Sequence, residues 1–205
     1  MNTKERILYI SLEMFAQKGF SGVTVRDIAG KVGVRESALY KHFKNKQDIL
    51  DSLIVVMKEK IKSVYLSNQV PEVITEDFSQ LYKELSIDRL CEISWNLFSL
   101  FTKDPVVSNF RRLLMREQFC NEQVARQYGE SYLLGVVHKQ GQTFAKLVED
   151  KLFKEENPEI IALQFYGPIL LLFQQYDCNP ENEDQLKDYL FKHIKAFGEN
   201  YSRKA

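Results

Sequence analysis

Apolar residues recur with a helical period along almost the whole chain. Val25, Ile28, Ala29 and Val32 stand at positions i, i+3, i+4 and i+7, which form one face of a helix. The same period predicts further helices over residues 46–65, 74–83, 87–102, 106–119, 122–153, 158–176 and 185–201. No segment shows the alternation of apolar and polar residues that is typical of a half-buried strand. The pattern therefore predicts an all-α fold.

The most specific pattern is found in residues 24–46, which are expected to form two short helices joined by a tight turn. Thr24 can cap the first helix with Asp27 at its third position, and Gly33 follows the last apolar residue, where a left-handed residue ends a helix. The second helix is expected over residues 36–43, with Leu39 and Phe43 on its buried side. The other side chains lie outside or at the rim: Arg35, Ser37, Ala38, Tyr40, Lys41, His42 and Lys44.

These outward side chains are of the kinds found on a helix that enters a DNA groove. Small and polar residues at the start of such a helix approach base edges, and cations or hydroxyls around them hold phosphates. Asn45 is expected to cap the next helix, with the Lys46 ammonium beside free backbone amides, a combination that favours a phosphate oxygen. The alternative is a small three-helix subdomain with a solvated basic surface and no ligand.

The first 50 residues also carry a series of short motifs in order and without gaps. They are Arg6-Ile7-Leu8, Phe15, Lys18-Gly19-Phe20, Val23-Thr24-Val25-Arg26-Asp27-Ile28-Ala29, Val32-Gly33-Val34, Ala38-Leu39-Tyr40-Lys41-His42-Phe43, and Lys46 followed by Ile49-Leu50. In these motifs the chain resembles the N-terminal domain of TetR-type (tetracycline-repressor-like) bacterial transcriptional repressors. The resemblance implies a three-helix helix-turn-helix DNA-binding domain over residues 1–48, a connecting helix over 46–65, and a helical effector-binding and dimerisation domain over 49–205.

Members of that family are homodimers that bind a palindromic double-stranded DNA operator and usually respond to an effector. The resemblance implies backbone-phosphate contacts for Thr24, Tyr40, Lys41 and Lys46, and implies that Arg35, Glu36, Ser37 and Ala38 face the bases. The whole expected DNA-binding set is Thr24, Arg26, Arg35, Glu36, Ser37, Ala38, Tyr40, Lys41, His42, Lys44 and Lys46.

The chain departs from the family pattern at two places. Arg35 stands where the family often has Ser or Thr, and Ser37-Ala38 stands where it often has Gly followed by Ser or Thr. Losing the cap hydroxyl should weaken the helix start by about 1 kcal/mol. Arg35 can instead reach a phosphate or a guanine edge, so this departure concerns base preference and not the fold.

Composition is that of a folded protein with an uneven distribution of charge. The 205 residues are 44% hydrophobic, which is enough for a core, and the net charge is zero. Residues 1–50 hold nine Lys or Arg against five Asp or Glu, net +4, whereas residues 51–205 hold 19 against 23, net −4. The basic part contains the turn. Apolar runs such as residues 169–173 are too short to span a bilayer, and no leader pattern opens the chain. We therefore expect a soluble intracellular protein with no membrane partner. The resemblance to TetR-type regulators implies the bacterial cytosol, with nucleoid association when the protein is bound to DNA.

The last two predicted helices carry more apolar residues than one buried stripe requires. Two such helices from each of two subunits can form a four-helix interface with two-fold symmetry, so a homodimer is expected. The expected interface residues are Phe165, Ile169, Leu172, Phe173, Leu186, Leu190, His193 and Phe197. The alternative is that both helices lie in the interior of a monomer.

The middle of the chain is rich in aromatic residues from several predicted helices. An apolar cavity with a few polar groups would hold a small hydrophobic effector of unknown identity. The expected lining is Trp95, Phe98, Phe110, Gln118, Tyr128, Tyr132, His138 and Phe165. The alternative is that these aromatic residues fill an ordinary core.

The sequence carries no signature of an enzyme, a metal site or a cofactor. No HExxH, GxSxG or GxxxxGK[ST] motif occurs, and His138 and His193 lack companion ligands at metal spacing. Cys91, Cys120 and Cys178 are isolated, which favours buried reduced cysteines over a thiol-based redox sensor. The sequence thus predicts a sequence-specific DNA-binding regulator, a dimeric repressor released by a ligand. The alternative is an effector-independent DNA-binding protein that acts through a protein partner.

Overall fold

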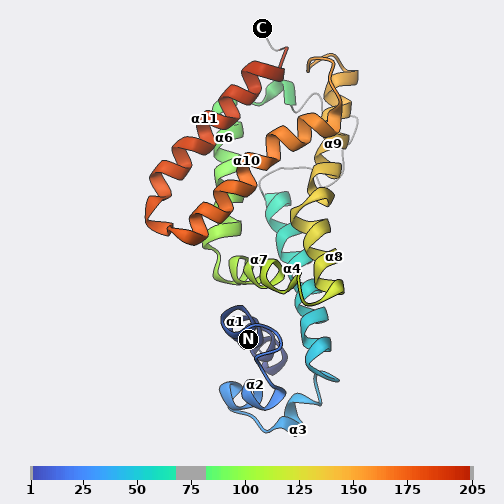
Figure 1. Ribbon diagram of the computed structural model, residues 1–205, viewed down its shortest axis with the longest axis vertical. Helices are drawn as coiled ribbons and strands as arrows, with labels where there is room; N and C mark the ends of the chain where they lie inside the picture. Colours follow the sequence, from blue (N-terminus) through green and yellow to red (C-terminus); the bar gives the residue numbers. More distant parts are fainter. Residues whose placement is uncertain (1, 68–81, 204–205) are drawn as a thin grey trace. The chain divides into compact units, whose positions relative to one another are not determined.

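The ordered elements of the chain are helices (Figure 1). The computed structural model describes residues 2–67 and 82–203. Among those residues, extended segments pair only at an isolated antiparallel bridge between Phe153 and Ser202. The all-α prediction is therefore confirmed. Most of the helix predicted over residues 74–83 lies outside the described residues.

The chain divides into two compact units. The first, called the head unit, comprises residues 1–64 and 103–128 and contains α1 (Thr3–Lys18), α2 (Val25–Val32), α3 (Glu36–Leu39), most of α4 (Lys46–Ser67), α7 (Pro105–Glu117) and the start of α8 (Glu122–Tyr132). The second, called the C-terminal unit, comprises the described parts of residues 65–102 and 129–205, with most of α6 (Ile87–Lys103), α9 (Leu134–Glu149), α10 (Pro158–Cys178), a short 3-10 helix (Pro180–Asn182) and α11 (Glu183–Tyr201). This division differs from the predicted boundary at residue 48, because α1 packs against α7.

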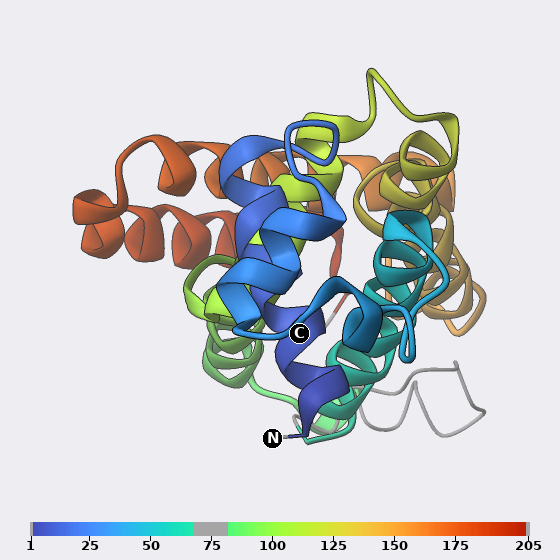
Figure 2. The same cartoon turned by 90° about the horizontal axis from the view of Figure 1, so that it is seen from below.

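The core of the head unit forms where α1 meets α2 and α7 (Figure 2). Helix α1 begins at a capping box, in which the Asn2 side chain accepts a hydrogen bond from the Glu5 N–H at 2.9 Å and the Glu5 carboxylate accepts one from the Asn2 N–H at 3.0 Å. Apolar side chains make up most of this core. Those buried in α1 are Ile7, Leu8, Leu12, Met14 and Phe15, and those buried in α7 are Val107, Phe110, Leu113 and Leu114. The segment of residues 19–46 packs against this core through α2.

The helix predicted over residues 122–153 is interrupted. Leu133 has φ −123° and ψ −124°, so α8 ends at Tyr132 and α9 starts at Leu134. A Cβ atom at Gly135 would lie 2.2 Å from the Glu130 carbonyl oxygen, so this close approach of two backbone segments requires glycine. The apolar period continues across the interruption, which is why the period alone predicted one helix.

The C-terminal unit is built around α10, which packs against both α9 and α11 (Figure 1). One buried cluster joins α10 to α9 through Phe144, Leu147 and Ile161, and a second joins α10 to α6 and α11 through Phe98 and Phe173. The side chains of α10 therefore lie between two aromatic clusters. None of the helices in the described ranges has the length and apolarity that would let it cross a membrane.

Candidate DNA-binding site

Helix α2 begins at Val25 with Thr24 as its N-cap, as predicted. The Thr24 hydroxyl accepts a hydrogen bond from the Asp27 N–H at 3.1 Å, and one oxygen of the Asp27 carboxylate accepts from the Thr24 N–H at 2.9 Å and from the Thr24 hydroxyl at 2.6 Å. These hydrogen bonds from Thr24 hold the pKa of the Asp27 carboxyl below its ordinary value. The capping box fixes where α2 begins.

The turn after α2 also forms as predicted. Gly33 adopts the left-handed conformation, with φ +80° and ψ 33°, and its N–H donates to the Ala29 and Gly30 carbonyls. The Val34 N–H donates to the Ala29 carbonyl at 3.0 Å. A residue with a Cβ atom is strained at this φ, so glycine sets the angle at which the chain leaves α2.

Helix α3 is shorter than the predicted span of residues 36–43. It covers Glu36–Leu39, and Arg35 at its N-cap position makes no side-chain capping hydrogen bond. The His42 N–H donates to the Leu39 carbonyl at 2.9 Å, a three-residue bond that tightens the chain into a turn after the helix. Leu39 and Phe43 are buried as predicted.

The predicted DNA-binding residues form an exposed and mostly polar face of α2, α3 and the turn after α3. The exposed members are Thr24, Arg26, Arg35, Glu36, Ser37, Tyr40, Lys41, His42 and Lys44. Ala38 is half-buried, beside the buried Leu39. The face combines cations with small side chains at the start of α3, and this chemistry suits phosphates and base edges.

Two residues of α1 support this face from the side. The Arg6 guanidinium donates a hydrogen bond to the Val32 carbonyl at 2.9 Å, which satisfies a carbonyl in the last turn of α2. The Lys4 ammonium lies 5.6 Å from the centre of the Phe43 ring. Both contacts tie α1 to the segment that bears the exposed polar face.

Lys46 has a different environment from the other predicted contacts. Its ammonium donates to the Phe20 carbonyl at 2.7 Å and to the Val23 carbonyl at 2.8 Å, and it lies 4.4 Å from the centre of the Phe20 ring. Burial lowers the pKa of this ammonium, and the neighbouring Glu117 carboxylate raises it in part. The predicted phosphate contact therefore has two main-chain partners within the head unit.

Glu117 is a residue of this region that the sequence analysis missed. It is 7% exposed, and its carboxylate accepts a hydrogen bond from the Phe20 N–H at 3.1 Å. A signal was present, because Phe110, Leu113, Leu114 and Glu117 stand at i, i+3, i+4 and i+7. A charged residue on the apolar stripe of a helix indicates a buried partner.

Residues 7–53 match the family described as bacterial regulatory proteins, tetR family. An uncharacterised HTH-type transcriptional regulator of Bacillus subtilis, YerO, is 45% identical over 47 residues, which are 23% of this chain and 16% of YerO. The class C tetracycline repressor protein of Escherichia coli is 41% identical over 54 residues, which are 26% of this chain and 25% of the repressor. The chain thus spans a quarter or less of the length of these two relatives.

Solved structures resemble the chain over nearly its whole length. The complex of SmeT with triclosan has a TM-score of 0.73 at 17% identity, over 99% of this chain and 93% of SmeT, which is described as the repressor of the Stenotrophomonas maltophilia multidrug efflux pump SmeDEF. Residues 7–53 thus carry the pattern of the tetR family, and over nearly its whole length the chain shares the fold of these solved structures. Its matched relatives are named as transcriptional regulators and not as enzymes.

The residues predicted to line an effector cavity are divided between the two units. Phe110, Gln118 and Tyr128 belong to the head unit, and the other five belong to the C-terminal unit. Phe98 and Tyr132 are buried, and Trp95 stacks on Phe98 with ring centres 5.4 Å apart. Within the C-terminal unit these rings are part of a packed core.

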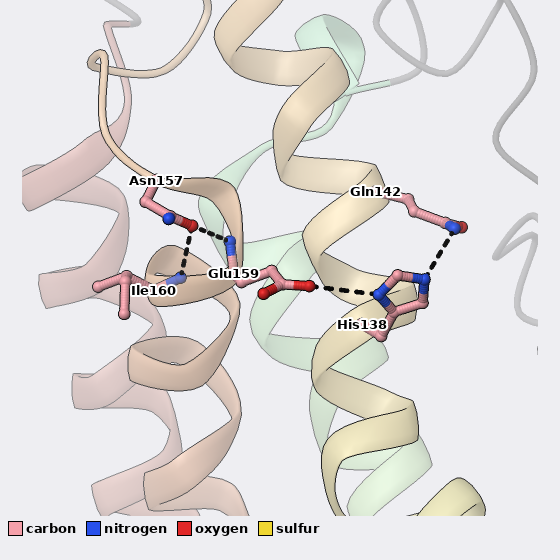
Figure 3. Close-up of polar contacts among 5 residues, drawn as sticks. All are labelled: His138, Gln142, Asn157, Glu159 and Ile160. Atoms are coloured by element: carbon pink, nitrogen blue, oxygen red, sulfur yellow. Dashed lines mark hydrogen bonds and ion pairs between the residues drawn. The ribbon is translucent and has the colours of Figure 1, made fainter.

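The prediction that His138 lines a cavity is corrected by its position on the surface of α9 (Figure 3). Its side chain is 66% exposed, with Nδ1 3.3 Å from the Glu159 carboxylate and Nε2 3.4 Å from the Gln142 amide nitrogen. In the described ranges, no three His, Cys, Asp or Glu residues gather as a metal site requires. His138 is therefore a surface residue that bridges α9 and α10.

Five of the eight predicted dimer-interface residues require a correction, whereas for the half-buried Phe165, Ile169 and His193 the interface role stays a prediction. Leu172, Phe173, Leu186, Leu190 and Phe197 are buried within one subunit. The sequence shows more apolar residues in α10 than one buried stripe needs. It does not show that α10 packs against both α9 and α11, which buries them. The exposed apolar residues of α10 and α11 are Ile160, Leu163, Leu171 and Tyr189.

The cysteines also differ in part from expectation. Cys91 is buried, and burial raises the pKa of its thiol, whereas Cys120 and Cys178 are exposed. All three are free.

Proposed function

We propose that this chain is a sequence-specific transcriptional regulator of the TetR family that binds a palindromic double-stranded DNA operator as a homodimer. It acts in the bacterial cytosol and is nucleoid-associated when bound. The observation that carries this proposal is the exposed polar face of α2 and α3, mounted on buried Ile28, Val32 and Leu39. A helix-turn-helix held in this way presents its second helix to the major groove.

The division of roles on that face follows from exposure and chemistry. Arg35, Glu36, Ser37 and Ala38 stand at the start of α3 and would face base edges, since this end of a recognition helix approaches the groove. Thr24, Arg26, Tyr40, Lys41, His42 and Lys44 surround them with hydroxyls, ring nitrogens and cations suited to phosphates. The net charge of +4 over residues 1–50 favours this arrangement.

The homodimer would pair through the outer face of α10 and α11. Ile160, Leu163 and Leu171 are 43%, 50% and 67% exposed and lie within one stripe of α10, and Tyr189 of α11 is 49% exposed. Exposed apolar side chains of this kind, repeated along one helix face, indicate a protein interface. A second copy of the chain supplies the same stripe, so a two-fold arrangement buries both.

Repression that a small hydrophobic effector relieves is the finer part of the proposal. The SmeT structure contains triclosan, and the aromatic clusters of the C-terminal unit offer apolar surroundings of that kind. The effector must bind the DNA-free state more tightly than the operator-bound state to release the operator. Equal operator affinities with and without bound ligand would instead favour the regulator that acts through a protein partner.

The proposal is tested by selecting bound sequences from random double-stranded DNA with the full-length protein. We expect a palindrome whose half-sites are about 34–36 Å apart. Arg35→Ala should cost about 1–3 kcal/mol at the base that Arg35 contacts and relax preference there. Lys192→Ala is the control, because it removes one exposed positive charge from α11. No enriched sequence, or a monomer in sedimentation at the concentrations that bind DNA, would contradict the proposal.

A further inference from the structure

The turn between α1 and α2 contains main-chain polar groups that the two helices leave without helical partners. Gly19 ends α1 with φ +79°, and its N–H donates to the Phe15 carbonyl. The Phe20 N–H and the Phe20 and Val23 carbonyls follow, just before the cap of α2. Main-chain groups in a partly buried turn need partners, since leaving them unpaired destabilises the turn.

Two charged side chains from other helices supply these partners. The Glu117 carboxylate, at the end of α7, accepts from the Phe20 N–H at 3.1 Å. The Lys46 ammonium, at the start of α4, donates to the Phe20 carbonyl at 2.7 Å and the Val23 carbonyl at 2.8 Å. Hydrogen bonds to ionised groups are stronger than neutral ones, so both ends of the turn are firmly held.

The two charges also compensate each other. Glu117 is 7% exposed, and its carboxylate acts electrostatically on the Lys46 ammonium. The Phe20 ring, 4.4 Å from the ammonium, adds a favourable cation–π contact. Removing either charge would leave the other without its opposite charge in a partly buried environment.

The held turn leads directly to the DNA-facing segment. Val23 is completely buried and precedes Thr24, the N-cap of α2. A shift of the Val23 carbonyl would therefore move the cap and with it the start of α2. An ammonium has three N–H donors, and two of those of Lys46 are used on carbonyls.

We propose that Glu117 and Lys46 are positioning residues that clamp the α1–α2 turn for DNA recognition, with the Lys46 ammonium bound to the protein main chain and not to a DNA phosphate. This role rests on the proposed DNA-binding function. It assigns Lys46 a task different from that of the exposed cations around α3.

The salt dependence of operator binding distinguishes a lysine that contacts a DNA phosphate from one that binds only the protein main chain. The full-length protein is titrated with its selected operator from low to high salt, as wild type, Lys46→Met and Lys41→Met. Lys41 is the matched control, because it is an exposed cation beside α3. Lys41→Met should reduce the salt slope by about 0.9 for each phosphate that is no longer neutralised, hence by about 1.8 in a dimer. Lys46→Met should weaken binding by about tenfold or more, because it removes the hydrogen bonds to the Phe20 and Val23 carbonyls, and should leave the slope unchanged. A slope change equal to that of Lys41→Met would overturn the proposal.

Hydrogen exchange tests the clamp without DNA. In Glu117→Ala the backbone amides of residues 19–23 should exchange about tenfold faster or more, whereas those of α11 should not change. Glu117→Gln keeps an oxygen that accepts from the Phe20 N–H and should exchange more slowly than Glu117→Ala. If Glu117→Ala does not fold, the exchange rates of Glu117→Gln are compared with those of the wild type instead. Unchanged exchange in residues 19–23 of both variants would overturn the clamp. If exchange in residues 19–23 rises in the Glu117 variants while the wild-type protein binds no DNA, the proposed function is contradicted and the structural role of Glu117 is not.

Discussion

Both units have a buried core, but the contacts that define the DNA-facing segment of the head unit differ from those that predominate in the C-terminal unit. In the head unit, side chains close in sequence to each helix end determine where helices start and stop, as in the Thr24–Asp27 capping box and at Gly33. In the C-terminal unit, aromatic rings from distant helices pack together, as when Phe98 stacks on Phe173 with centres 5.2 Å apart. The first kind of contact acts within one turn, and the second joins segments far apart in the chain.

This difference matches the work proposed for each unit. A DNA-reading face must present particular side chains at fixed places, and caps and turns fix places at modest energetic cost. A unit that pairs with a second copy and accepts an apolar ligand needs a large apolar interior, which aromatic packing provides. Substitutions in the two units should therefore differ in how much they lower the free energy of unfolding.

The largest effect is expected from Phe98→Ala in the C-terminal unit. Phe98 is 1% exposed and stacks on both Trp95 and Phe173. Removing its ring leaves a cavity and should lower the free energy of unfolding by about 3–5 kcal/mol. Urea denaturation followed by circular dichroism measures the loss. Trp95, the single tryptophan of the chain, reports on this unit by fluorescence.

Phe119→Ala is the matched control for this substitution. Phe119 is 86% exposed, so the same change should alter the free energy of unfolding by less than about 0.5 kcal/mol. Equal losses for the two variants would show that packing around Phe98 does not stabilise the unit. Separate transitions by fluorescence and circular dichroism would show that the two units unfold independently.

Local rules explain why much of the head unit could be predicted. The cap at Thr24, the turn at Gly33 and the burial of Leu39 and Phe43 each depend on residues within a few positions. The end of α3 at Leu39 was missed, because the apolar spacing continues to Phe43 after the helix has ended. Glu117 was missed because its partner Phe20 is far away in the sequence.

The same reasoning shows why the C-terminal unit was predicted only in outline. Helical period gave the positions of α10 and α11 and the apolar character of both. It could not tell which apolar face packs inside the subunit, so buried Leu172 and Leu190 were assigned to an interface and exposed Leu163 and Leu171 were not. Burial is decided by contacts with α6 and α9, which no local pattern contains.

A smaller effect is expected from Thr24→Ala in the head unit. The substitution removes the hydroxyl that accepts from the Asp27 N–H and should cost about 1 kcal/mol of unfolding free energy. Thr24→Ser keeps the hydroxyl and serves as the control. Denaturation by urea at neutral pH measures both variants. A loss in Thr24→Ser as large as in Thr24→Ala would contradict the capping role.

Acid should reduce the difference between wild type and Thr24→Ala. Hydrogen bonds from Thr24 lower the pKa of the Asp27 carboxyl in the folded state below its ordinary value of 3.8. A carboxyl with a lowered folded-state pKa stabilises the protein above its unfolded-state pKa, and this stabilisation is lost as the pH falls through the folded-state pKa. The gap between the two proteins should therefore narrow below about pH 4.

The smallest effect is expected from His138→Ala. Asn157, the N-cap of α10, lies nearby, so a surface pair and a helix cap can be compared within the C-terminal unit (Figure 3). The His138 and Glu159 side chains are each 66% exposed, so their pair should contribute less than about 0.5 kcal/mol. The neighbouring Asn157 side chain accepts from the Glu159 N–H at 2.9 Å and the Ile160 N–H at 3.4 Å, and Asn157→Ala should cost about 1 kcal/mol. Thermal denaturation of both variants measures the contrast. If Asn157→Ala matches Thr24→Ala, capping has equal value in both units, and the difference between the units lies in long-range aromatic packing. A greater loss in His138→Ala than in Asn157→Ala would show instead that surface pairing between α9 and α10 stabilises the C-terminal unit.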